Sequence, residues 1–122
     1  MPQVEYIHHG DKQILLMDFA NIVDYSVFPG LVEESMRLVR TSNSGRSVLA
    51  AIDMSGTRIN KTVITSLKKL SRNNGPFMQA VAFVGLSAVW SFVVKLLLWA
   101  TKRTNHRVIR DRNLAIRWLA QQ

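Results

Sequence analysis

The chain has 122 residues, of which 48% are hydrophobic, and its net charge is +8. This length and apolar content fit one compact domain, spanning residues 1–122, with a single core. Because the chain contains no cysteine, disulfides, thiolate metal sites and thiol nucleophiles are excluded. The first ten residues are polar and lack the apolar core of a secretory signal, so we expect a cytoplasmic protein.

The first half of the chain predicts a hairpin followed by a helix and a strand. Residues 4–8 and 13–19 are apolar runs on either side of a Gly-Asp turn, which indicates two antiparallel strands. Residues 26–42 have helical periodicity, and Glu33 lies four residues before Arg37, a spacing that predicts an ion pair on the helix surface. Residues 47–53 then form a short apolar run typical of a buried strand.

The second half predicts alternating helices and strands. A helix is expected over residues 60–75, with Asn60 as its N-cap and Asn74-Gly75-Pro76 at its end. A strand at residues 78–84, a helix from Ser87 and a short strand at residues 106–110 follow. Asp111 is expected to cap a last helix. The residues predicted to be buried on that helix are Leu114, Ala115, Trp118 and Leu119.

The apolar stretch at residues 77–103 could in principle cross a membrane, because its first 18 residues carry no charge. Gly85 divides it, however, and its first part is rich in β-branched and aromatic residues. This composition favours a strand enclosed on both faces, followed by a helix. We therefore predict no transmembrane span.

The helix expected from Ser87 has a wide apolar surface that includes Trp90, Phe92, Leu96 and Trp99. Another helix of the same chain can cover this apolar patch. Alternatively, the patch forms a homodimer contact, a lipid-facing surface or the wall of an apolar cavity. Basic residues beside it would suit an anionic membrane surface.

Charge is distributed unevenly along the chain. Up to Asp53 there are four basic and seven acidic residues, whereas from Met54 onward there are twelve basic residues and one acidic residue. Such asymmetry indicates an anionic partner, and a solvated basic surface with no dedicated partner explains it equally well. The basic segment at residues 101–112 contains no recognised DNA or RNA motif, so a specific nucleic-acid partner is not expected.

The element order ββαβαβαβα predicts an α/β domain with a mixed, mainly parallel sheet and about four helices packed on it. Parallel sheets place ligands beyond the carboxyl ends of their strands, near helix N-termini that favour anions. Two loops there combine glycine with hydroxyl groups, although turn-forming glycines and capping hydroxyls explain them as well. The candidate ligand-binding residues are Asp53, Ser55, Gly56, Thr57, Arg58, Gly85 and Ser87.

Other chemistry is poorly supported by the sequence. The three histidines are not spaced as a metal site, and no base is marked out for Ser87. Asp18, Asp24 and Asp53 lie near expected strand ends, where they could form a carboxylate cluster or serve as caps and turn residues. We expect a non-enzymatic protein with no cofactor and no metal.

Three segments together resemble STAS domains (sulfate transporter and anti-sigma factor antagonist), most closely the SpoIIAA-like branch. "VLAAIDMSGTRINKTVITSLKKL" is similar to the family's strand, loop and helix with an acidic strand end. "AVAFVGLSAVWSFVVKLLL" is similar to its V-x-x-V-G strand and aromatic-bearing helix, and "RVIRDRNLAIRWLAQQ" to its short strand and terminal helix. The segments occur in the family's order over residues 14–119. The fold of this branch has also been likened to Sec14-type lipid-binding domains.

The resemblance implies a regulatory or binding domain that acts through a protein partner or through a small apolar or anionic ligand. An amphiphile or lipid carrier at anionic membranes is the alternative. In the anti-sigma factor antagonists, an Asp-Ser pair after the middle strand carries a regulatory phosphoserine. This chain has no such pair, and Thr62 is the nearest hydroxyl. The residues expected at a partner surface are Asn60, Lys61, Thr62 and Lys68, with Thr62 as a candidate modification point or a surface residue.

Overall fold

The computed structural model describes residues 2–42, 48–86 and 105–122. The elements follow the predicted order. The strands are β1 (Gln3–His9), β2 (Lys12–Asp18), β3 (Val48–Asp53), β4 (Met78–Val84) and β5 (His106–Ile109). The α-helices among the described residues are α1 (Phe28–Arg40), α2 (Lys61–Asn74) and α4 (Arg112–Ala120). Two short 3₁₀ helices, η1 (Tyr25–Val27) and η2 (Gly75–Phe77), precede α1 and β4.

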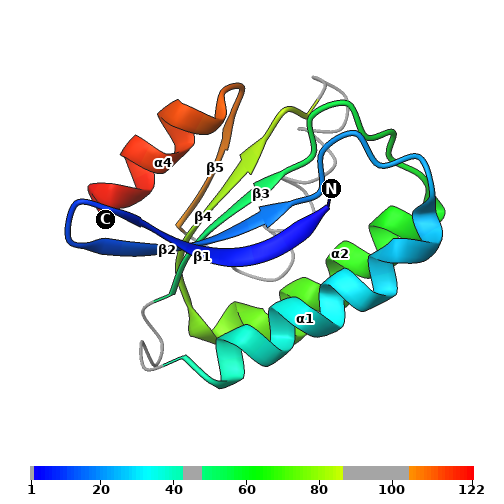
Figure 1. The fold of residues 1–122 in the computed structure, drawn as a ribbon, viewed down its shortest axis with the longest axis horizontal. Coiled ribbons are helices and arrows are strands. Elements are labelled where there is room, and N and C mark those ends of the chain that lie inside the picture. The colour runs from blue at the N-terminus through cyan, green and yellow to red at the C-terminus, as the bar shows by residue number, and fades with distance from the viewer. Residues whose placement is uncertain (1, 43–47, 87–104) are drawn as a thin grey trace.

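The strands form a single five-stranded sheet in the order β1-β2-β3-β4-β5. β1 and β2 are antiparallel, and each later pair of neighbours is parallel. Helices α1 and α2 lie side by side on one face of this sheet, and α4 lies on the other (Figure 1). The structure therefore confirms the prediction of an α/β domain with a mixed, mainly parallel sheet.

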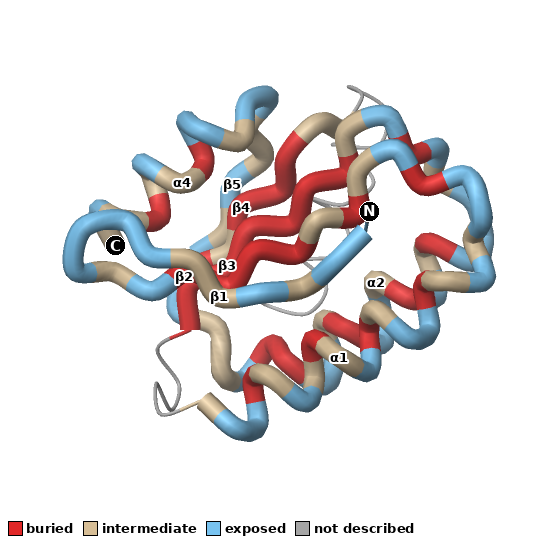
Figure 2. Tube along the Cα trace, viewed as in Figure 1, coloured by how far each residue is buried: buried red, intermediate tan, exposed pale blue. Residues whose placement is uncertain are grey.

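The core has two layers because side chains alternate between the faces of the sheet. On the face covered by α1 and α2, Leu15 and Met17 pack with apolar residues of both helices. On the face covered by α4, Ile14 and Leu16 pack with Ala115 and Leu119 of that helix. The middle strands are buried along most of their length, whereas β1 and β5 are largely exposed or half-buried (Figure 2).

The predicted ion pair between Glu33 and Arg37 is wrong. Arg37 instead pairs with Glu34, with 2.6 Å between Nη2 and Oε1. Glu33 pairs with Lys69 of α2, with 2.9 Å between Oε1 and Nζ. The reason is tertiary: α1 packs against α2, so a cation from another helix reaches Glu33.

The prediction that Leu114 is buried is also wrong, because 44% of this residue is exposed. The buried line of α4 runs through Ala115 and Leu119, with Trp118 partly buried beside it. Successive helical residues are separated by about 100°. Leu114 is therefore rotated by about 100° from Ala115 around the helix axis, outside the arc that faces the sheet.

The helix expected from Ser87, including Trp90, Phe92, Leu96 and Trp99, lies outside the described residues. The strand expected before it is confirmed as β4. Among the helices that the structure describes, none is both long enough and apolar enough to span a membrane.

Candidate functional site

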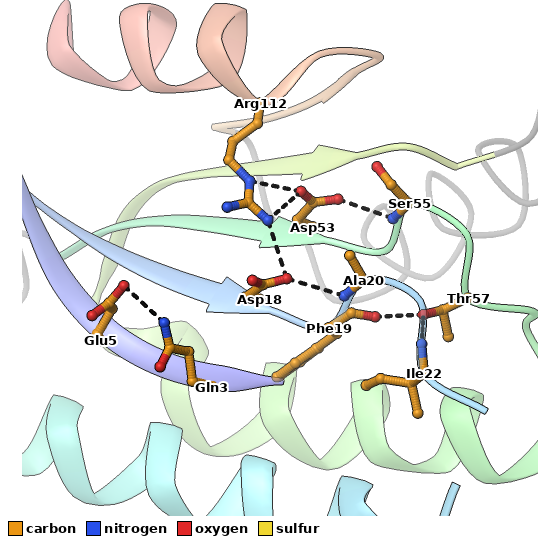
Figure 3. A network of polar contacts seen from close by, with 10 residues as sticks. All are labelled: Gln3, Glu5, Asp18, Phe19, Ala20, Ile22, Asp53, Ser55, Thr57 and Arg112. Carbon is orange, nitrogen blue, oxygen red and sulfur yellow. Dashed lines mark hydrogen bonds and ion pairs between the residues drawn. The ribbon is translucent and has the colours of Figure 1, made fainter. Parts of the chain in front are cut away.

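The carboxyl ends of β2 and β3 are joined to the start of α4 by one arginine. Asp18 and Asp53 are the last residues of their strands and are partners in the parallel register. Arg112 lies between them: its Nε and Nη2 atoms are both 2.7 Å from Asp53 Oδ2, and Nη2 is 3.1 Å from Asp18 Oδ1 (Figure 3). Thus two of the three candidate carboxylates do meet, and a cation neutralises part of their charge.

The environment of Asp53 keeps it ionised. Burial raises the pKa of the carboxyl group, but hydrogen bonds from Ser55 and the Arg112 guanidinium outweigh this effect, so the pKa lies below its ordinary value. One of these bonds runs from the Ser55 backbone N–H to Asp53 Oδ1, over 2.9 Å. Asp53 is therefore a structural anion that fixes the β3–α2 loop and the start of α4. Asp24 has a separate role, because its side chain caps η1 by accepting from Ser26 N–H.

Two loops at the same edge of the sheet, residues 19–25 and 54–60, are bonded to each other; we call them the strand-end crest. The hydroxyl of Thr57 donates to the carbonyl of Phe19 and accepts from the N–H of Ile22, 2.9 Å away (Figure 3). Asn21 N–H donates to the carbonyl of Ser55 over 2.8 Å. These bonds satisfy buried backbone groups of both loops, so the crest is preorganised.

Both candidate glycines have positive φ, and a side chain on either would crowd a neighbouring residue. Gly56 has φ +74°, and a Cβ on it would lie 2.1 Å from Asn21 Oδ1. Gly85 has φ +78°, and a Cβ there would lie 2.1 Å from Ser55 Oγ and 2.7 Å from Ser55 Cα. Glycine readily adopts positive φ and allows close backbone approach. The two predicted loops therefore touch at Ser55 and Gly85.

The structure brings together most of the predicted ligand-binding residues, but it gives several of them internal partners. Asp53 and Thr57 are buried and bonded within the chain, Ser55 is half-buried, and Gly56 and Arg58 are exposed. Ser87 lies outside the described residues. Ligand binding at these loops stays a prediction.

The helix after the crest begins as predicted. Asn60 is its N-cap, and its Oδ1 atom accepts from Val63 N–H over 3.0 Å. Thr62 follows in the first turn with an exposed side chain. The predicted cap is confirmed, and Thr62 is accessible.

Basic residues form one exposed line that starts at the crest. Lys61, Lys68 and Arg72 are exposed and fall within about 40° of one another on the α2 surface, over a length of about 16 Å. Arg58 is exposed in the loop just before α2. We call these four residues the basic stripe. In the part of the chain that the structure describes, none of the four forms an ion pair.

A large aliphatic side chain stands at the tip of the crest. Val23 is 90% exposed, although its neighbourhood is fixed. On one side Ile22 is bonded to Thr57. On the other, the Tyr25 hydroxyl donates to the Arg58 carbonyl over 3.0 Å, and the Tyr25 ring stacks on Phe28. The crest therefore holds an apolar tip close to the first residue of the basic stripe.

Sequence reasoning did not identify Arg112 or Val23 as site residues. Arg112 follows the cap residue Asp111, and its partner Asp53 is 59 positions away, so no local pattern reveals the contact. Val23 resembles any apolar residue next to an aspartate. Among the described residues, no three histidine, aspartate or glutamate side chains gather as a metal site.

Comparison with solved structures identifies the fold. The chain is similar to an uncharacterized protein of the DUF3478 family with a SpoIIAA-like fold from Shewanella loihica PV-4, with a TM-score of 0.67 and 18% identity over 95% of this chain and 91% of that one. An anti-sigma-factor antagonist (STAS) domain protein from Planctomyces limnophilus gives a TM-score of 0.49 and 11% identity over 97% of this chain and 98% of that one. No protein-family model and no curated protein matches significantly. The Shewanella likeness shows that this chain has a SpoIIAA-like fold.

Proposed function

We propose that the protein is a non-enzymatic binding domain whose strand-end crest and basic stripe dock an acidic surface of a partner protein. The observation that carries the proposal is the position of Val23, an exposed aliphatic side chain on a fixed loop bonded next to Arg58. An apolar contact surrounded by charges is the usual composition of a protein interface. A preorganised loop also loses little conformational entropy on binding.

The charge of the partner follows from the basic stripe. Four cations without ion pairs among the described residues, including Arg58 and Lys61, create a positive field along α2. Such a field steers an anionic partner and disfavours a basic one. A protein surface that combines carboxylates with an apolar recess matches both the stripe and Val23.

Thr62 offers a means of control over this docking. It is exposed in the first turn of α2, beside Lys61 and four residues after Arg58. Phosphorylation would add a charge of about −1.5 to −2 there. The new charge would oppose the positive field, and the acidic partner would bind more weakly.

The experiment starts from a partner captured by the intact protein from a lysate of its own host, identified by mass spectrometry and then purified. Titration of the purified pair would compare the wild-type protein with three variants. Val23→Ser should weaken binding about tenfold, because burial of a valine side chain contributes about 1.5 kcal/mol. Arg58→Glu with Lys61→Glu should abolish binding at low ionic strength.

The control is Arg117→Glu, which reverses one exposed basic charge on α4, on the opposite face of the sheet. It should bind like the wild-type protein. If the partner binds the charge-reversal variant as tightly as the wild-type protein, the crest is not the docking surface. The alternative function, an amphiphile carrier, depends on Trp90, Phe92, Leu96 and Trp99, which lie outside the described residues.

A further inference from the structure

We propose that the outer edge of β1 pairs with the same edge of a second copy of this chain, in an antiparallel register centred on Ile7. β1 is an end strand of the sheet, and within the described residues it pairs only with β2. Its outer N–H and C=O groups can therefore bond a further strand. The inference is independent of the proposed partner surface, which lies on the crest and α2.

The side chains of β1 divide between the two faces of the sheet. Ile7 packs in the cluster under α4, so Glu5 and His9, two residues away on either side, are on that same face. Tyr6 faces the other side, where its hydroxyl donates to the Leu38 carbonyl over 3.2 Å. Glu5, His8 and His9 are exposed.

Charge favours this register over one centred on Glu5. A twofold axis at Ile7 places Ile7 opposite its own copy and each Glu5 opposite His9 of the other chain, on the same face. The histidine N–H can then donate to the carboxylate, and such a cross-strand pair stabilises the antiparallel arrangement. An axis at Glu5 would instead oppose two like charges, which is destabilising. The sequence Glu5-Tyr6-Ile7-His8-His9 is thus complementary to itself when reversed.

The overall charge of the protein also favours this edge. β1 and the following turn belong to the part of the chain up to Asp53, where acidic residues outnumber basic ones. The opposite edge is formed by β5, which carries Arg107 and is followed by Arg110. Two copies with net positive charge therefore repel each other least when they meet at β1.

The expected dimer is weak and has a defined geometry. One short strand from each copy buries an area at the low end of the range for protein interfaces, so we expect a dissociation constant of roughly 100 μM. The axis is perpendicular to the sheet and reverses the strand direction. The strand-end crests of the two copies would therefore lie at opposite ends of one continuous ten-stranded sheet, and each dimer could hold two partners.

Cysteine cross-linking tests the register directly, because the natural chain has no cysteine. Directly opposed residues of antiparallel strands have Cα atoms about 4.5–5.5 Å apart, within the range for a disulfide. Ile7→Cys should therefore form a disulfide-linked dimer under mild oxidation. Tyr6→Cys and His8→Cys should each cross-link poorly alone but efficiently when mixed. Gln13→Cys, an exposed position on β2 rather than on the edge, is the control.

Sedimentation of the wild-type protein and of charge variants provides a second test that does not depend on Ile7→Cys folding. The wild-type protein should show a concentration-dependent dimer. Glu5→Lys should weaken it at least fivefold, and Glu5→Lys with His9→Glu should restore it. A wild-type protein that stays monomeric at every concentration would overturn the proposal. The proposal would also be overturned if Ile7→Cys cross-links no better than Gln13→Cys, or if Tyr6→Cys cross-links more efficiently alone than when it is mixed with His8→Cys. Arg58→Glu with Lys61→Glu should leave the dimer unchanged, which separates this test from that of the partner surface.

Discussion

Replacing Arg112 by methionine should destabilise the protein by about 2 kcal/mol. Asp53 is 4% exposed. Without the guanidinium, the buried carboxylate would lose its ion pair, and Ser55 would be its remaining hydrogen-bond donor among the described residues. Removing one partner of a fully buried ion pair costs about 3–5 kcal/mol. The Arg112 side chain is 36% exposed, so water screens the pair and the expected loss is about half of that. For a chain of this size, the melting temperature should fall by about 8 °C.

Urea denaturation at neutral pH measures this loss. Arg117→Met, an exposed arginine of the same helix, is the matched control and should change stability by less than about 0.5 kcal/mol. Arg112→Met combined with Asp53→Asn should recover most of the lost stability, because no buried charge is then left unpaired. If Arg112→Met is no less stable than Arg117→Met, the arginine does not hold the strand ends and α4 together.

Three further predictions concern pH, packing and buried hydrogen bonds. The folded-state pKa of Asp53 is lowered, so its ion pair should stabilise the protein fully above the unfolded pKa of about 3.9 and progressively less as pH falls below it. The difference in unfolding free energy between the wild-type protein and Arg112→Met should therefore shrink as the pH of the urea titration is lowered through this range. A difference that stays constant would contradict this. Gly85→Ala should destabilise the protein by well over 2 kcal/mol because of the clash with Ser55, whereas Gly10→Ala, at φ +63° with no atom within 4 Å, should cost about 1 kcal/mol; equal losses in urea melts would refute the close contact. Thr57→Val should cost about 2 kcal/mol and Thr57→Ser much less, because only the serine can satisfy the two buried backbone groups; equal melting temperatures of the two variants would exclude the bridge.

The order and type of the described elements could be predicted because their signals are local. Apolar runs indicated the strands, and Asn60 and Asp111 were recognised as caps from their positions before helical sequence. Both caps are confirmed, as Asp111 accepts from the N–H groups of Asn113 and Leu114. The parallel sheet followed from the crossover helices, since parallel neighbours require a long connection.

Contacts between distant elements could not be predicted in the same way. Glu33 has a suitable arginine four residues away, but a lysine of α2 is its partner. Arg112 bonds Asp53 across the sheet, and one sequence contains no signal for that distance. The exposure of Val23 likewise depends on how two separate loops bond each other. Which ion pairs form and which side chains are exposed depend on tertiary packing, and a local sequence pattern contains no information about that packing.

The close contact between Ser55 and Gly85 links the position of the loop after β3 to that of the residues after β4. The space beside Gly85 is too small even for a Cβ, so we expect that Ser55 cannot move toward Gly85 unless Gly85 moves as well. A protein that presses on the crest would therefore shift the point from which the chain leaves β4. A side chain at Gly85 should therefore displace Ser55 and its loop as well as destabilise the fold.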